Sequence, residues 1–203
     1  MKNLRPFFVT AAVEGTIDEA ALRILLVHCG LNPGPIYSGF GKNYIRQRIK
    51  AYNQAARHST WVVLIDLNHE AECAPALRRN WLPSPNPLMN MRVAVRGIES
   101  WLLGDQERIA SFLGVPLSKI PQKPDSIHNP KKTMVELAAR SRVRNIREDM
   151  VPRPGSGRIV GPLYTARVIE FISDRSVGWR PEIAARNSAS LNRCLLCLKR
   201  LES

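Results

Sequence analysis

Three acidic side chains in this sequence each follow a predicted strand, and together they could bind a metal ion. They are Glu14, Asp66 and Glu99. In open α/β sheets, ligands bind beyond the carboxyl ends of the strands, so parallel strands would bring these carboxylates to one edge. Crowded like charges raise each other's pKa, and a hard divalent cation relieves that repulsion. The pattern therefore predicts a Mg²⁺ or Mn²⁺ site.

The chemistry expected of such a site is phosphodiester hydrolysis. A bound divalent cation can activate water and stabilise charge on a phosphoryl group. Asn68 and Glu70 follow Asp66 closely and are candidate additional metal ligands, while His69 is a weaker candidate that also fits a loop. Each acidic residue also has a structural interpretation. Glu99 could serve only its helix N-terminus, and Asp66 could simply end a buried strand.

The first half of the chain alternates strands with helices. Apolar runs predict strands at 6–13, Trp61–Ile65 and Met91–Arg96, whereas residues 30–41 are rich in Gly and Pro and contain at most a short strand. A helix is expected after Thr16, with Thr16 as its N-cap and Glu19 completing a capping box. This alternation predicts an α/β fold with a mainly parallel sheet flanked by helices.

The second half of the chain contains no predicted strands. Residues 129–150, 160–174 and 188–202 have helical patterns, and a loop rich in Pro and Gly separates the first two. We therefore expect an α/β core over residues 1–115 and a helical extension over residues 116–203.

The charge of the chain points to an anionic partner. Its 203 residues carry a formal net charge of +13, which favours nucleic acid. Candidate backbone-binding residues lie in the second half, and an equally good interpretation is a solvated helix face. These candidates are Lys131, Lys132, Arg142, Arg144, Arg147 and Arg158.

The apolar runs and the cysteines of the sequence argue against a membrane protein and a disulfide-stabilised protein. No apolar run approaches the length of a membrane span, and no export signal is evident, so a cytoplasmic location without a membrane partner is expected. Four scattered cysteines do not form a disulfide framework. Cys194 and Cys197 have metal-like spacing but share a helical stripe with leucines, which favours core packing over zinc.

Three segments resemble motifs of Toprim domains. The first is Val13-Glu14-Gly15-Thr16-Ile17-Asp18 and the second is Leu64-Ile65-Asp66-Leu67-Asn68. The third, with its core Glu99-Ser100-Trp101-Leu102-Leu103, is the most specific. It is similar to a stand-alone Toprim-like family related to the nuclease domain of OLD-type endonucleases.

This resemblance implies a four-stranded parallel sheet with metal bound at the strand ends. Glu14 would bind metal or move protons, Asp66 would be a metal ligand, and Glu99 would supply the third acidic position. Asn68 replaces the usual second aspartate of the second motif, which puts a two-metal site in doubt because a neutral amide binds Mg²⁺ more weakly than a carboxylate.

The leading functional prediction is a Mg²⁺- or Mn²⁺-dependent nuclease, with DNA expected ahead of RNA as its substrate. A role in defence against foreign DNA follows only by analogy with the family. The alternative is a non-catalytic binding or regulatory subunit, with an unidentified partner protein, that has lost the full acidic set. A third interpretation is a phosphotransfer enzyme acting on a small substrate.

Overall fold

A computed structural model describes residues 7–68 and 70–201, which form two compact units. The first unit holds residues up to Val95 and the segment from Arg193 onward, and the second holds Arg96–Asn192. The division therefore falls before the expected boundary at residue 115. The reason is that α4 (Ile98–Leu103) packs on later helices, α6 and α9, as part of the helical unit.

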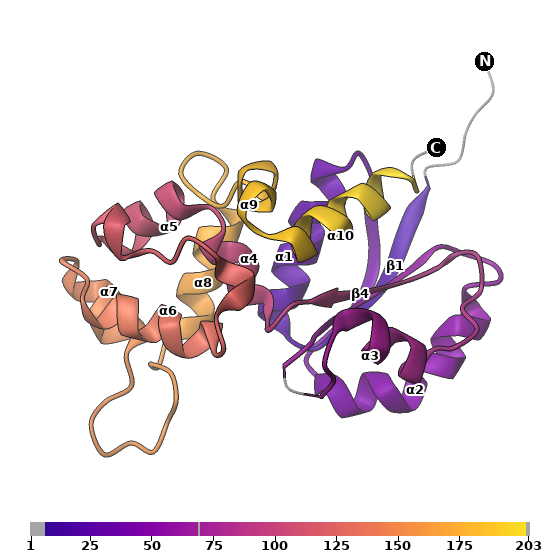
Figure 1. The fold of residues 1–203 in the computed structure, drawn as a ribbon, viewed down its shortest axis with the longest axis horizontal. Helices are drawn as coiled ribbons and strands as arrows, with labels where there is room; N and C mark the ends of the chain where they lie inside the picture. The colour runs from indigo at the N-terminus through magenta and orange to yellow at the C-terminus, as the bar shows by residue number, and fades with distance from the viewer. Residues whose placement is uncertain (1–6, 69, 202–203) are drawn as a thin grey trace. The chain divides into compact units, whose positions relative to one another are not determined.

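The first unit is built on a sheet of four parallel strands, confirming the predicted α/β fold (Figure 1). Its strands are β1 (Phe8–Val13), β2 (Asn32–Tyr37), β3 (Trp61–Asp66) and β4 (Met89–Ala94). Their spatial order is β2-β1-β3-β4, so β1 and β3 are the central strands. Both are almost continuously apolar and buried, as expected of parallel strands covered on both faces.

Helices connect the strands and cover the sheet. They are α1 (Thr16–His28), α2 (Gly41–Ala55) and α3 (Ala74–Trp81). On one face, Ile45 and Ile49 of α2 and Leu77 of α3 share a buried core with Val63 and Ile65 of β3. This packing fixes the start of α2, and hence its first residues, beside the carboxyl ends of the strands.

The segment from Arg193 onward returns to the first unit as part of α10 (Ala189–Lys199). The thiol of Cys29 lies 3.9 Å from the backbone oxygen of Leu195, and the thiol of Cys197 lies 3.5 Å from Oδ1 of Asn90 on β4. Cys194 is buried beside them. Cys194 therefore packs in the core, as the leucine stripe indicated, whereas Cys197 is partly buried.

The second unit is helical in all its regular elements. They are α4 (Ile98–Leu103), α5 (Gln106–Leu113), two short 3-10 turns, α6 (Pro130–Ala139), α7 (Arg144–Met150), α8 (Tyr164–Ser173), α9 (Pro181–Asn187) and the start of α10. The single helix expected over 129–150 is two helices, because residues 140–143 leave the helical path. Trp101, Tyr164 and Phe171 are the largest fully buried side chains described in this unit. Within the described part of the chain, every helix is too short or too polar to cross a membrane.

Candidate active site at the carboxyl edge of the sheet

The strand order defines where a ligand should bind in the first unit. From β1 the chain moves to one edge of the sheet to form β2, then crosses back so that β3 pairs with the other side of β1. The carboxyl ends of β1 and β3 therefore flank the topological switch point. In α/β sheets of this kind, ligands bind beyond the carboxyl ends of the strands at such a switch point.

Glu14 and Asp66 meet at this switch point. Val13 is in register with Leu64, so the residues that follow lie side by side at the rim. The backbone N–H of Asp66 donates a hydrogen bond of 2.7 Å to Oε1 of Glu14. The Glu14 side chain thus crosses from β1 to the end of β3. Both acidic residues therefore lie at the same edge of the sheet, and their predicted roles as metal ligands stay predictions.

Asp18 has a structural role at the same edge. Its Oδ2 accepts a 3.0 Å hydrogen bond from the backbone N–H of Gly15, which is the N-cap of α1. The capping box predicted for Thr16 and Glu19 is wrong by one residue. Gly15 is the N-cap residue of α1, and Asp18 is the residue three positions later whose side chain caps it. Glu19 instead accepts hydrogen bonds from Arg23 and Ser38.

Lys42, which the sequence did not single out, brings a positive charge to the rim. Its ammonium donates to the backbone oxygen of Asp66 at 2.6 Å and lies 3.0 Å from Oε2 of Glu70. The neighbouring Gly41 N–H donates to the backbone oxygen of Glu14 at 3.1 Å. The start of α2 is thereby joined to the ends of both central strands. The signal was present in the sequence, since a lysine opens the helix that follows β2.

The other predicted ligands lie just after β3. Asn68 is exposed in a turn with φ of 48°, a conformation that asparagine tolerates better than most residues. Glu70 is directed to Lys42, and its side chain is 36% exposed. His69 lies outside the described residues. Asn68 and Glu70 thus belong to the loop beside the rim, and their predicted roles as ligands stay predictions.

The residues at the rim fit one hard cation better than two. No group of three or more His, Cys, Asp or Glu residues suited to a metal occurs in the described part of the chain. Mg²⁺ is commonly held by one or two carboxylates, with water and substrate phosphate in its other positions. Glu14 and Asp66 supply that number of carboxylates. Glu14, Asp66 and the amide oxygen of Asn68 are all hard oxygen donors.

Glu99 lies in the second unit and has partners of its own there. Only 2% of its surface is exposed. Its Oε1 accepts a 3.2 Å hydrogen bond from the hydroxyl of Tyr164 and lies 3.3 Å from the ammonium of Lys131. Burial, followed by the charge and hydrogen bond of Glu99, raises the pKa of Tyr164. A lysine already balances this carboxylate, and its predicted role as a metal ligand stays a prediction.

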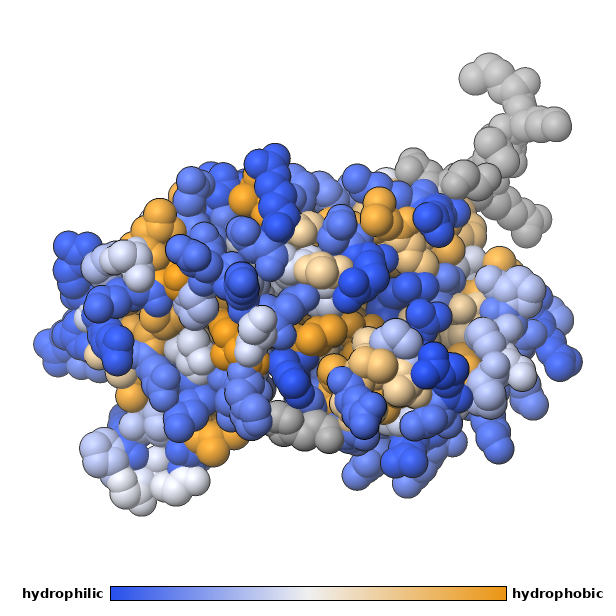
Figure 2. Space-filling view, in the orientation of Figure 1, coloured by the Kyte–Doolittle hydropathy of each residue, from blue (hydrophilic) through white to orange (hydrophobic). Residues whose placement is uncertain are grey.

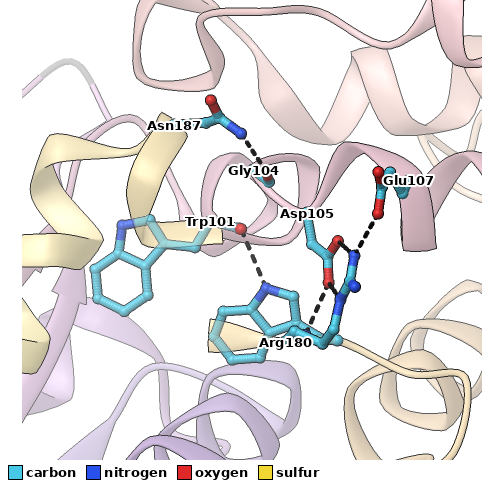
Figure 3. A network of polar contacts seen from close by, with 7 residues as sticks. Trp101, Gly104, Asp105, Glu107, Arg180 and Asn187 are labelled. Carbon is cyan, nitrogen blue, oxygen red and sulfur yellow. Dashed lines mark hydrogen bonds and ion pairs between the residues drawn. The ribbon is translucent and has the colours of Figure 1, made fainter. Parts of the chain in front are cut away.

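The Glu-Ser-Trp-Leu-Leu segment forms the buried helix α4. Trp101 donates from Nε1 to the hydroxyl of Ser190 at 2.7 Å, and its backbone oxygen accepts from Nε1 of Trp179 at 3.3 Å. Beside it, the buried carboxylate of Asp105 accepts two hydrogen bonds from the guanidinium of Arg180, at 2.7 and 2.9 Å (Figure 3). Hydrogen bonds to Asp105 and Glu107 raise the pKa of Arg180. This segment therefore organises the helical unit.

The predicted nucleic-acid-binding residues all lie in the second unit. Lys131 pairs with Glu99, Lys132 with Glu136 and Arg144 with Glu148, so these three have acidic neighbours. Two grooves are lined by residues of α7 and of the loop that follows it. One of about 800 Å³ is lined in part by Arg147 and Arg153, and one of about 440 Å³ by Arg153 and Arg158. Arg142 is exposed just before α7. The basic character of this loop is therefore accessible, whereas that of α6 is partly neutralised.

Comparison with models of protein families, with curated protein sequences and with solved structures finds no match. The fold and the geometry of the rim are therefore the basis for a functional assignment.

Proposed function

We propose that the protein is a Mg²⁺- or Mn²⁺-dependent phosphodiester hydrolase acting on nucleic acid, DNA before RNA. One observation carries this proposal. Glu14 and Asp66 come together at the switch point of the sheet, with 2.7 Å between Oε1 of Glu14 and the backbone nitrogen of Asp66. Two acidic residues at the ligand-binding edge of a parallel sheet support this proposal, because one or two carboxylates commonly hold Mg²⁺.

Each residue at the rim has a distinct part in this proposal. Glu14 and Asp66 hold the cation, which when bound supplies Lewis acidity and lowers the pKa of water. The Asp66 N–H keeps the Glu14 carboxylate turned toward the end of β3. Lys42 fixes the backbone of Asp66 and adds positive charge beside an incoming phosphate. The exposed arginines of the second unit, Arg147 and Arg158, would hold the polymer backbone.

The matching experiment is a cleavage assay with plasmid, linear DNA and RNA in Mg²⁺ or Mn²⁺. Wild-type protein should cleave, and Glu14→Gln and Asp66→Asn should abolish cleavage while remaining folded. Glu182→Gln alters an exposed carboxylate of the second unit and should cleave normally. Cleavage that survives in both rim variants would refute the proposal, as would an absence of cleavage of every polymer.

A second candidate is a nucleic-acid-binding or regulatory subunit without catalysis. Two observations favour it: the described residues hold no group of three metal-binding side chains, and Lys42 already places an internal cation at the rim. In this case the protein would bind nucleic acid but cleave no polymer in Mg²⁺ or Mn²⁺.

A further inference from the structure

Helix α2 carries three side chains stacked along one side, which we call the α2 ladder: Phe40, Tyr44 and Arg48. The ring centroids of Phe40 and Tyr44 are 4.6 Å apart, with 24° between the ring planes. The guanidinium carbon of Arg48 lies 4.0 Å from the centroid of the Tyr44 ring. Four residues advance a helix by about 6 Å and return to nearly the same side, so these positions form a line along the helix axis.

The first member of the ladder is exposed. Phe40 shows 60% of its surface, a large fraction for a phenylalanine ring fixed against another aromatic side chain. Phe40 is the exposed end of a stack in which its ring packs on Tyr44 and the Tyr44 ring packs on the Arg48 guanidinium. Scattered exposed apolar side chains need no explanation, but an ordered stack with a cation is a surface suited to another flat ring.

The charge of helix α2 indicates which kind of partner would supply the flat ring that stacks on Phe40. Helix α2 contains four cations, Lys42, Arg46, Arg48 and Lys50, and no Asp or Glu. The surface over α2, at lower right in Figure 2, is mainly hydrophilic on the face drawn. A partner that combines flat π-systems with regularly spaced negative charge is a nucleic acid, whose bases stack on aromatic side chains while its phosphates attract basic ones.

The ladder begins at the candidate active site. Gly41, which follows Phe40, donates its N–H to the backbone oxygen of Glu14 at 3.1 Å. Lys42 in the next position donates to the backbone oxygen of Asp66 at 2.6 Å. The exposed ring is therefore two residues away from a lysine that contacts the end of β3. A base stacked on Phe40 would bring a neighbouring phosphate toward the carboxylates.

We propose that the α2 ladder is a stacking platform for the bases of single-stranded nucleic acid and directs the strand toward Glu14 and Asp66. In an intact duplex the base faces are covered by their neighbours, so the platform selects unpaired strands or frayed ends. The inference rests on the proposed function in one respect, which is that the bound strand is cleaved at Glu14 and Asp66. Binding itself requires no metal ion, and the two can be tested apart.

The test is fluorescence anisotropy in chelator, with labelled thymidine and uridine homopolymers and a labelled duplex as probes. Wild-type protein should bind the single strands more tightly than the duplex. Phe40→Ala and Tyr44→Ala should each weaken single-strand binding roughly 5- to 150-fold, the range of one base stack. Phe40→Trp should retain binding because it keeps a flat ring, and Arg48→Lys should lose part of it because the planar group is gone.

Phe8→Ala is the matched control, since Phe8 is also exposed and lies at the opposite end of β1. It should leave binding unchanged, and circular dichroism should show every variant folded. Equal binding by wild-type and Phe40→Ala protein would overturn the inference. So would a change in oligomeric state of Phe40→Ala, seen by size-exclusion chromatography, without any change in nucleic-acid binding.

The thymidine and uridine homopolymers test a DNA strand and an RNA strand in parallel. Stacking on either polymer that depends on Phe40 supports the inference, and the tighter arm shows which of the two homopolymers the platform prefers. If single-strand binding depends on Phe40 but nothing is cleaved, the platform stands and the hydrolase proposal fails. If cleavage requires Glu14 but Phe40→Ala binds normally, the reverse holds.

Discussion

The backbone N–H of Asp66 donates a 2.7 Å hydrogen bond to the carboxylate of Glu14, 52 residues earlier in the chain. This bond links the ends of the two central strands at the edge where a ligand is expected. It also separates two roles of Glu14, because its side chain both satisfies a partly buried donor and presents negative charge. The two roles can be tested with different substitutions.

Glu14→Ala should destabilise the first unit by about 1–3 kcal/mol, since the N–H of Asp66 loses its acceptor. Glu14→Gln keeps an oxygen acceptor at the same place and should cost less than about 1 kcal/mol. Urea unfolding monitored by circular dichroism measures both values. Equal destabilisation by the two variants would show that the hydrogen bond is not what matters.

Metal binding should follow the carboxylates of the rim. Calorimetric titration with Mn²⁺ should show one site per chain in wild-type protein, weakened about tenfold or more by Asp66→Asn or Glu14→Gln, a loss of about 1.4 kcal/mol. Glu99→Gln should leave this affinity unchanged, because Lys131 balances that carboxylate within the second unit. A stoichiometry of two, or an unchanged affinity in both rim variants, would contradict the single-metal arrangement.

Arg180 should be among the most sensitive residues for the stability of the helical unit. It neutralises Asp105, whose side chain is fully buried, through a bidentate pair. Arg180→Ala leaves that carboxylate without its cation and should cost about 3–5 kcal/mol. Arg180→Lys keeps the charge but loses the forked geometry, so its stability should lie between that of wild-type protein and that of Arg180→Ala. Thermal melts of the three proteins test this order, and near-identical melting temperatures would refute it.

Tyr164 predicts a loss of stability at alkaline pH. Its raised pKa means that the folded state keeps the proton where the unfolded state, with a pKa near the ordinary 10, has released it. Stability from this group is therefore complete below pH 10 and falls as the pH rises further, by up to about 1.4 kcal/mol per pH unit. Urea unfolding across this range should show a steeper decline for wild-type protein than for Tyr164→Phe. Parallel curves would contradict the assignment.

The four cysteines should differ sharply in reactivity. Burial raises the pKa of the Cys194 thiol to about 12, so thiolate is scarce near neutral pH, whereas Cys73 is exposed. A thiol reagent near neutral pH should modify Cys73 rapidly in native protein and Cys194 only after unfolding. Mass spectrometry of the modified peptides identifies the sites. Rapid native labelling of Cys194 would place α10 away from the core.

The parallel sheet and the meeting of Glu14 with Asp66 could be predicted because both depend on local patterns. The continuous apolar runs of β1 and β3 require burial on both faces, and the acidic residues follow at their carboxyl ends. Strand β2 was harder to predict because its sequence contains Pro33, Gly34 and Pro35. An edge strand tolerates prolines that a central strand would exclude, and β2 lies at the edge.

The partners of the charged residues could not be predicted from spacing. Glu99 follows a strand and begins a helix, as a site residue would, yet Lys131 and Tyr164 approach it from distant helices. Lys42 reaches Asp66 only because α2 packs against the central strands. Such contacts depend on tertiary packing, which single-sequence patterns do not encode. Neither the stacking in the α2 ladder nor the exposure of Phe40 was predicted from the sequence.

The return of residues from Arg193 onward to the first unit has a consequence for biosynthesis. The thiol of Cys29 and the amide of Asn90 find their partners in Leu195 and Cys197, which leave the ribosome only after the whole helical unit. Until then, one side of the nascent sheet lacks part of its cover and is open to chaperones or to misassociation. Premature termination within the helical unit would therefore harm the α/β unit as well.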